Sequence, residues 1–208
     1  ADNSRLGIQN VVLVSDRGYS GTKNINDCLR NKVGFLFNMK CGVSGSLTQE
    51  LIDEERLNLQ DLNRRDWYTQ VFQVTKKINW IYEPSPVKNQ RSTKKTQETA
   101  ELYWHIYFDR QIAENARQGL FERIDRVQEK IANGKALDEN EQTLLEEVFE
   151  KHEKDDVVNY TVDNKKVDQK LRYKGYRVLV SDEISDARKA WCAYQERWIV
   201  EDTFKTLK

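Results

Sequence analysis

The sequence has few cysteines, histidines and prolines, and each shortage argues against a class of fold or site. Its three cysteines, Cys28, Cys41 and Cys192, are an odd number without a C-x-x-C pair, which argues against a disulfide framework. With only two histidines, no zinc-ligand spacing is present. We therefore expect reduced, buried thiols in a cytoplasmic protein. The two prolines, Pro84 and Pro86, and the nine glycines predict long regular elements in place of a loop-rich secreted fold.

The chain also has no excess of one charge and no long hydrophobic run. Its 34 basic and 34 acidic residues balance, so no overall field attracts nucleic acid, and any contact with DNA depends on local patches. No apolar run approaches the ~20 residues that span a bilayer, and the N-terminus does not resemble a signal peptide. We expect no membrane partner.

What the sequence does contain is a strand–helix–strand unit near its start. Residues 11–15 form a short, β-branched apolar run, which is typical of a strand buried on both faces. A Gly-containing turn over 16–21, a helix over 23–31 and a strand over 34–39 are expected to follow. This order is the repeating unit of an α/β sheet.

The remaining patterns predict a mixed region and then a return to the α/β core. Residues 177–182 repeat residues 11–16 at five of six positions, which we interpret as two similar core strands. The core is therefore expected in two parts, 1–40 and 176–208, with a mixed α+β insertion over 41–175. The patterns predict helices over 47–57, 110–132, 138–152 and 187–208, and strands over 67–74, 78–82, 102–108, 157–162 and 176–180.

The helical run at the end of the chain places four polar residues on one face. Tyr194, Arg197, Glu201 and Lys208 have the spacing Y-x2-R-x3-E-x6-K, with no Gly or Pro between them. At roughly 100° per residue they lie within an arc of about 60°. Apolar side chains on one side and tryptophans on the other border this face, which favours the wall of a cleft. The alternative is a solvated face on which Arg197 and Glu201 form an ordinary i,i+4 pair.

Asp16 is the second candidate for chemistry. It follows the first strand, at the edge of an open α/β sheet where ligands bind. With Glu201 it would supply hard oxygen ligands for Mg²⁺, and two ions about 3.5–4 Å apart would activate the attacking hydroxyl and stabilise the leaving oxygen of a phosphodiester. The alternative is that Asp16 is a turn residue or a helix cap. Asp182, at the end of the repeated strand, is a rival ligand.

These residues together resemble a known family. The stretch V-L-V-S-D-R-G-Y-S around Asp16 looks like the second-aspartate motif of bacterial insertion-sequence DDE transposases. The spacing of the four polar residues in the final helix is similar to the Y-R-E-K signature of the IS-four type. The resemblance implies a partial ribonuclease H-like α/β fold: 1–40 as the first part of the catalytic core, 41–175 as the insertion domain, and 176–208 as the second part. The glycine turn after Asp16 fits the motif, which favours Asp16 over Asp182.

The resemblance also implies roles for the individual residues. Asp16 and Glu201 would be catalytic metal ligands for two Mg²⁺ or Mn²⁺ ions. Arg197 and Lys208 would contact phosphates of the transposon end, and Tyr194 would hydrogen-bond the DNA backbone nearby. The expected partners are double-stranded DNA, as transposon ends and target, and a second copy of the protein in a homodimeric synaptic complex. The expected location is the cytoplasm, at the bacterial nucleoid.

One departure from the family pattern limits these expectations. A DDE site needs three carboxylates, and the only acidic residue before Asp16 is Asp2, which is too close to be the first. We expect a catalytic-core fragment that lacks the first Asp and neither binds paired metals nor cuts DNA by itself. Two alternatives stay open: a non-enzymatic, degenerate DNA-binding remnant, and an α/β phosphohydrolase using Asp16. The second would need a phosphate-binding glycine loop, for which Gly18-x2-Gly21 is sparse.

Two features of the predicted insertion are candidates for DNA contact. Trp67, Trp80 and Trp104 could stack on a flipped base, or they could be core aromatics of the insertion. The basic stretch over 88–95 could contact phosphates, or it could be a solvated loop.

Overall fold

The computed structural model describes residues 12–19, 21–84, 97–154 and 157–206, with side chains to Arg197 in the last helix. Its chain divides into two compact units. The first joins Ala1–Phe108 with Tyr176–Lys208, and the second is Asp109–Gly175. The basic stretch predicted over 88–95 and Lys208 lie outside the described residues, and so does the side chain of Glu201.

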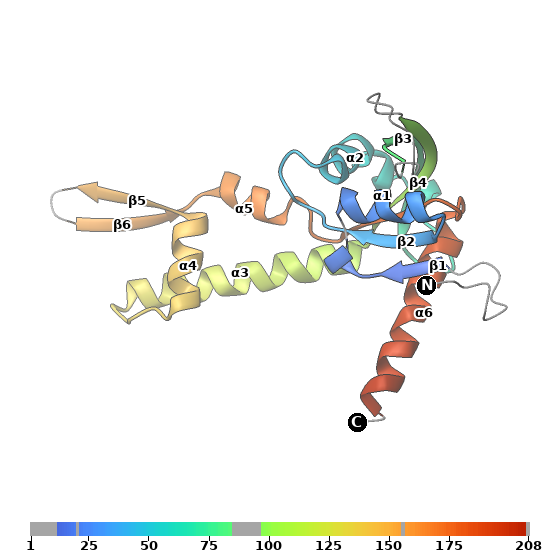
Figure 1. Cartoon of the computed structure of the whole chain (residues 1–208). Coiled ribbons are helices and arrows are strands. Elements are labelled where there is room, and N and C mark those ends of the chain that lie inside the picture. The colour runs from blue at the N-terminus through green and yellow to red at the C-terminus, as the bar shows by residue number, and fades with distance from the viewer. Residues whose placement is uncertain (1–11, 20, 85–96, 155–156, 207–208) are drawn as a thin grey trace. The chain divides into compact units, whose positions relative to one another are not determined.

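The first unit is built on a five-stranded mixed sheet (Figure 1). The strand order is β1-β2-β7-β4-β3. Strands β1 and β2 are parallel, and β2 pairs antiparallel with β7, as do β7 with β4 and β4 with β3. The strands are β1 (Val12–Ser15), β2 (Gly34–Met39), β3 (Phe72–Tyr82), β4 (Glu98–Phe108) and β7 (Tyr176–Ser181). The predicted α/β class is confirmed, and the sheet is consistent with a ribonuclease H-like core.

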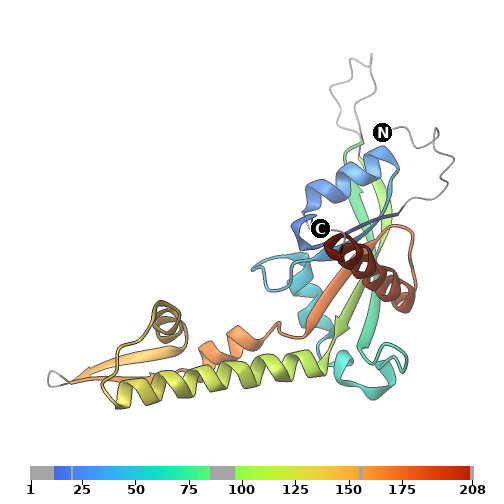
Figure 2. The ribbon, with the colours of Figure 1, turned by 90° about the horizontal axis from the view of Figure 1, so that it is seen from below.

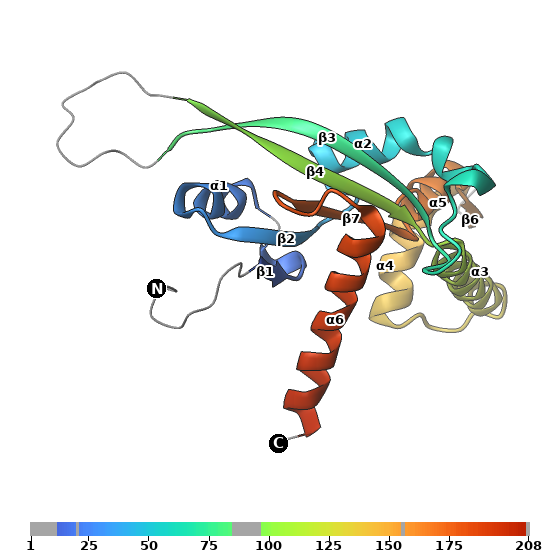
Figure 3. The same ribbon diagram turned by 90° about the vertical axis from the view of Figure 1, so that its right-hand side faces the viewer.

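Helices cover both faces of this sheet. Figures 1 and 3 show α1 and α6 on opposite sides of β1 and β2. Because side chains alternate along a strand, Leu36 packs with Tyr194 under α6, while Phe35 and Phe37 contact each other on the other face. The helices of this unit are α1 (Thr22–Asn31), α2 (Leu47–Glu55) and α6 (Ala187–Thr206), with short 3-10 turns η2 (Arg17–Tyr19), η3 (Asn58–Gln60) and η4 (Leu62–Arg64).

The second unit is a helical body with a β-hairpin. Figure 2 shows α3 lying beside α5, with α4 near its C-terminal end. Asp109 caps α3, and Asp138 forms a capping box with Glu141 at the start of α4. The elements are α3 (Arg110–Ala132), α4 (Glu139–Val148), β5 (Phe149–Lys154), β6 (Val157–Val162) and α5 (Asn164–Leu171). Their core consists of Leu120, Ile124, Val127, Leu144, Val148, Phe149 and Val167.

Three predicted elements, one helix and two strands, differ from the structure in type or extent. The helix predicted over 138–152 ends at Val148, and Phe149 starts a strand that pairs with Val162. Phe149 is buried in the core of the unit, so the extended backbone there is fixed by packing and not by helix propensity. The two strands predicted over 67–82 are a turn followed by the single strand β3. Helix α5 was not predicted.

The described sheet also bears on the predicted domain boundaries. Strands β3 and β4, which lie within the predicted insertion 41–175, pair into the main sheet through β7. The separate compact unit therefore begins only at Asp109. The boundaries 1–40, 41–175 and 176–208 stay a prediction.

Candidate active site

The sheet and α6 bring Asp16 beside two of the residues predicted to share its site. Asp16 follows Ser15, which pairs with Phe37, so that Asp16 lies next to Asn38 at the end of β2. Tyr194 of α6 packs over β2 and its hydroxyl donates a hydrogen bond to Asp16 Oδ1 at 3.2 Å. Arg197, one turn further, places Nη1 3.7 Å from Asp16 Oδ2. The structure therefore brings these three residues together, and their roles stay a prediction.

The two oxygens of Asp16 have different surroundings. Oδ1 accepts the backbone N–H of Arg17 at 2.7 Å, the Tyr194 hydroxyl, and the Asn38 amide at 3.4 Å. Oδ2 has the guanidinium of Arg197 as its contact among the described residues. The carboxylate is held in place through one oxygen, while the other faces the guanidinium of Arg197.

The charge of Asp16 is stabilised although the side chain is 59% exposed. Its pKa is lowered first by the hydrogen bond from the Arg17 backbone, against the opposing effect of partial burial. The Arg197 cation and the donors Tyr194 and Asn38 lower the pKa further. Because water screens an exposed group, the energetic effect is modest, but the group is ionised and accessible near neutral pH.

Asn38 is a site residue that sequence reasoning missed. It is 2% exposed, and its Nδ2 donates to the Tyr194 hydroxyl at 2.7 Å as well as to Asp16. Its Oδ1 has no hydrogen-bond partner within the part of the chain that is described. The available signal was a lone polar residue inside the otherwise apolar strand over 34–39. A buried amide needs partners, and here they are Asp16, directly after β1, and Tyr194 of α6.

Arg177 is the second missed residue. It is the second residue of β7, next to Val178, which pairs with Met39, so it lies at the same end of the sheet as Asp16. Its guanidinium is 5.1 Å from the centre of the Tyr194 ring and 5.0 Å from that of Trp191. The guanidinium of Arg197 approaches the Tyr194 ring as well, at 4.9 Å.

The rival ligand Asp182 lies at the other end of the sheet. Because β7 runs antiparallel to β2, Ser181 pairs with Leu36, and Asp182 follows it near the start of β2. Its Oδ1 accepts the backbone N–H of Phe35 at 2.8 Å, and burial raises its pKa. Asp182 therefore serves the main chain of β2 and not the site at Asp16.

The donor set fits a hard divalent cation only in part. Asp16 offers an accessible carboxylate oxygen, the ligand type that Mg²⁺ prefers. Among the described side chains, no group of three Asp, Glu, His or Cys residues could hold a metal. Glu201 lies in α6, four residues after Arg197, and its side chain is not among those described. Asp16 thus offers one ligand in the described part of the chain, and the metal site stays a prediction.

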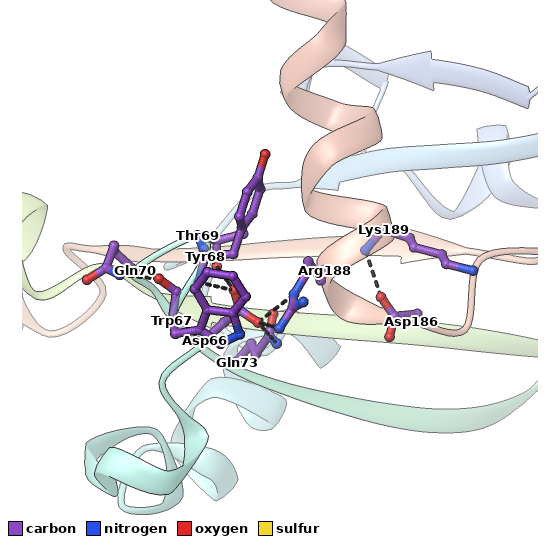
Figure 4. Close-up of polar contacts among 9 residues, drawn as sticks. All are labelled: Asp66, Trp67, Tyr68, Thr69, Gln70, Gln73, Asp186, Arg188 and Lys189. Carbon is purple, nitrogen blue, oxygen red and sulfur yellow. Dashed lines mark hydrogen bonds and ion pairs between the residues drawn. The ribbon is translucent and has the colours of Figure 1, made fainter.

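The three tryptophans considered for base stacking have different environments. Trp104 is 1% exposed, and Trp80 lies 6.1 Å from it while donating to Asn26 Oδ1. Trp67 is 72% exposed. Figure 4 shows it beside Arg188, whose guanidinium lies 5.6 Å from the Trp67 ring.

The turn that carries Trp67 is anchored by a buried carboxylate. Asp66 Oδ1 accepts the backbone N–H groups of Tyr68 and Thr69, and Oδ2 accepts from Arg188 Nε at 2.7 Å (Figure 4). Burial is the largest single effect on the pKa of Asp66 and raises it, but the hydrogen bonds from Thr69 and Arg188 and the Arg188 cation together lower this pKa. The exposed tryptophan therefore sits on a rigid base that joins the start of β3 to the start of α6.

Comparison with known families identifies the class of protein. Residues 2–208 match the family described as the transposase DDE domain, and the chain belongs to this family. Membership implies an enzyme of DNA transposition and recombination that binds DNA, and DDE domains generally use divalent metals. No curated protein and no solved structure matches the chain. No helix within the described ranges is long and apolar enough to cross a membrane.

Proposed function

We propose that this domain performs metal-dependent DNA strand cleavage and transfer at transposon ends, as a transposase of the IS-four type. One observation carries the proposal: Asp16, at the end of β1, is fixed by Tyr194 of α6 and faces Arg197 one turn along. A carboxylate beside cations suits a metal-bound phosphodiester, because the metal needs hard anionic oxygen and the phosphates need positive charge.

In this proposal Asp16 and Glu201 hold the catalytic Mg²⁺ or Mn²⁺ ions. Asp16 would use Oδ2, because its Oδ1 already accepts three hydrogen bonds. Divalent ions would there lower the barrier to attack on the phosphodiester. The chain's own residues orient the carboxylate and bind the DNA. Tyr194, Arg197 and Lys208 would contact the backbone of the transposon end. A homodimer acting at the nucleoid would bring two ends together.

We also propose that the 208-residue chain does not cleave DNA by itself. Asp16 is the single carboxylate that the described residues place at this site, and Glu201 would add a second. The three-carboxylate site would need one more Asp from elsewhere. The same observation favours the second candidate function, a DNA-binding remnant without catalysis.

The cleavage experiment uses a transposase that contains this domain and a further catalytic Asp. Asp16→Asn should abolish Mg²⁺- or Mn²⁺-dependent nicking of DNA that carries the transposon end, while binding to that end persists. Asp182→Asn is the matched control, because it makes the same change at the other end of the sheet, and it should retain nicking. Nicking by Asp16→Asn at the wild-type rate would contradict the proposal. Nicking by the 208-residue chain alone would contradict the proposal that this chain is inactive by itself.

Trp67 is the tryptophan we propose for contact with an unstacked base. It is exposed on a rigid turn, whereas Trp104 is buried and Trp80 packs against Trp104. Base stacking on an aromatic ring contributes about 1–3 kcal/mol. Trp67→Ala should therefore weaken binding to single-stranded DNA roughly 5- to 150-fold without changing the melting temperature. Equal binding by the variant and wild type would exclude this role.

A further inference from the structure

Arg177 differs from the paired arginines of its unit. Its side chain is half-buried against the rings of Trp191 and Tyr194. In the part of the chain that is described, it forms no ion pair with a carboxylate. Other partly buried arginines of the unit do form one: Arg30 with Asp27, Arg56 with Asp53, and Arg188 with Asp66.

An aromatic environment alone compensates a half-buried cation poorly. A guanidinium loses hydration when it is covered, and a ring face returns only part of that free energy. A second cation nearby adds repulsion. The guanidinium of Arg197 lies 4.9 Å from the centre of the Tyr194 ring, and that of Arg177 lies 5.1 Å from the same centre. The described side chains at this end of the sheet therefore place two guanidinium groups around one ring and one carboxylate, Asp16, beside them.

This charge pattern suits an anion that reaches both arginines. The planar guanidinium group binds phosphate oxygens through two parallel N–H donors, and stacking on a ring fixes its orientation before the anion arrives. Asp16 already contacts Arg197, which leaves Arg177 as the cation whose charge is least compensated.

We propose that Arg177 contacts a DNA backbone phosphate together with Arg197. The two guanidinium groups at the Tyr194 ring form a phosphate clamp, defined by Arg177, Tyr194 and Arg197. The clamp lies beside Asp16, so the phosphate it holds is adjacent to the candidate cleavage site. This inference rests on the proposed DNA function. It adds Arg177, which is not one of the four residues of the Y-R-E-K spacing in the final helix.

The test measures binding of the 208-residue chain to a mixed-sequence 20-base-pair duplex over a series of salt concentrations. Arg177→Met removes the charge but keeps an unbranched side chain against the rings. It should weaken binding by about tenfold and reduce the slope of log K against log salt by about 0.9, the value for one lost phosphate contact. Arg197→Met should have a similar effect, and the double variant should lower the slope by about 1.8.

Lys23→Met is the matched control. Lys23 is exposed on α1, on the other side of the sheet from α6, and the variant loses the same unit of charge. It should leave the slope within error of wild type. Circular dichroism and thermal melting check that each variant is folded, and Arg177→Gln takes the place of Arg177→Met if the latter melts early.

The outcomes separate the inference from the function on which it rests. A folded Arg177 variant with the wild-type affinity and slope contradicts the clamp alone. A loss equal to that of Lys23→Met also contradicts it, because the effect would then come from net charge. A wild-type chain that does not bind the duplex contradicts both the DNA-binding proposal and the clamp.

Discussion

The hydroxyl of Tyr194 donates a hydrogen bond to Asp16 across 178 residues of sequence and receives one from Asn38. The three side chains come from α6, from the residue that follows β1, and from β2, so the contact depends on the correct packing of α6 on the sheet. A helix residue thus orients the carboxylate that ends the first strand. Any change that shifts α6 on the sheet will move the candidate metal ligand.

Asn38→Asp should destabilise the fold at neutral pH. Asn38 Nδ2 lies 3.4 Å from Asp16 Oδ1, so the substitution places two carboxylates in contact, one of them buried. We expect a loss of roughly 1–3 kcal/mol in the free energy of unfolding. The buried acid would have a raised pKa when folded, so the loss should shrink as the pH falls. Urea unfolding at pH 7 and pH 5 measures both effects.

The double variant Asn38→Asp, Asp16→Asn provides the control for this prediction. It restores a single charge at the pair and should recover much of the lost stability at pH 7. If it is no more stable than Asn38→Asp alone, repulsion between the two groups is not the cause. A loss that is independent of pH leads to the same conclusion.

His105 should make the fold less stable in acid. It is fully buried in β4, and its Nε2 lies 2.8 Å from the carbonyl oxygen of Ile184. Because a carbonyl oxygen can only accept a hydrogen bond, Nε2 carries the proton, and Nδ1 accepts a hydrogen bond from Thr75. Burial lowers its pKa, while the bond to Ile184 and the charge of Asp186 oppose this. Unfolded chains take up the proton near pH 6.5 and folded ones only at lower pH. The contribution of the neutral His105 to the stability of the fold is therefore fully present above pH 6.5 and is lost progressively as the pH drops below this value.

Urea unfolding between pH 7.5 and 5 tests the role of His105. The contribution of one such group cannot exceed about 1.4 kcal/mol per pH unit. His105→Gln keeps a polar side chain but cannot titrate, so it should flatten this part of the stability profile. His152→Gln is the matched control, since His152 is exposed on β5. Equal profiles for wild type and His105→Gln would show that another group is responsible.

Much of the sheet could be predicted from sequence because its strands are short apolar runs. The strand over 34–39 and the helix over 110–132 were predicted with the bounds of β2 and α3. Phe149 shows the limit: its neighbours in sequence favour helix, and only its pairing with Val162 makes it a strand. Asn38 and Arg177 were missed for the same reason. Their partners, Tyr194 above all, are distant in sequence and become neighbours only through packing.

Asp66→Ala should cost more stability than Arg188→Ala. Asp66 is buried and accepts the partly buried backbone N–H groups of Tyr68 and Thr69, so its removal takes away the acceptor that both of them use. We expect about 2–4 kcal/mol for Asp66→Ala. Arg188 is 42% exposed, so water can replace part of its hydrogen bonding to Asp66 in the variant. For Arg188→Ala we expect a loss of about 1–2 kcal/mol in the free energy of unfolding. Chemical denaturation compares the two, and an equal or reversed order would contradict this account of the turn.

Tyr194→Phe should raise the pKa of Asp16 while leaving the fold in place. The change removes the hydroxyl that donates to Asp16 Oδ1 but keeps the ring beside which Arg177 and Arg197 lie. Because the hydroxyl is one of the groups that lower this pKa, its loss shifts the carboxyl toward its ordinary value. The side-chain carboxyl carbon of Asp16, followed by NMR through an acid titration, measures the shift. Tyr82→Phe is the matched control, because its hydroxyl donates to Glu98 at the far end of β3. An unchanged titration of Asp16 in Tyr194→Phe would show that the bond across 178 residues does not hold the carboxylate.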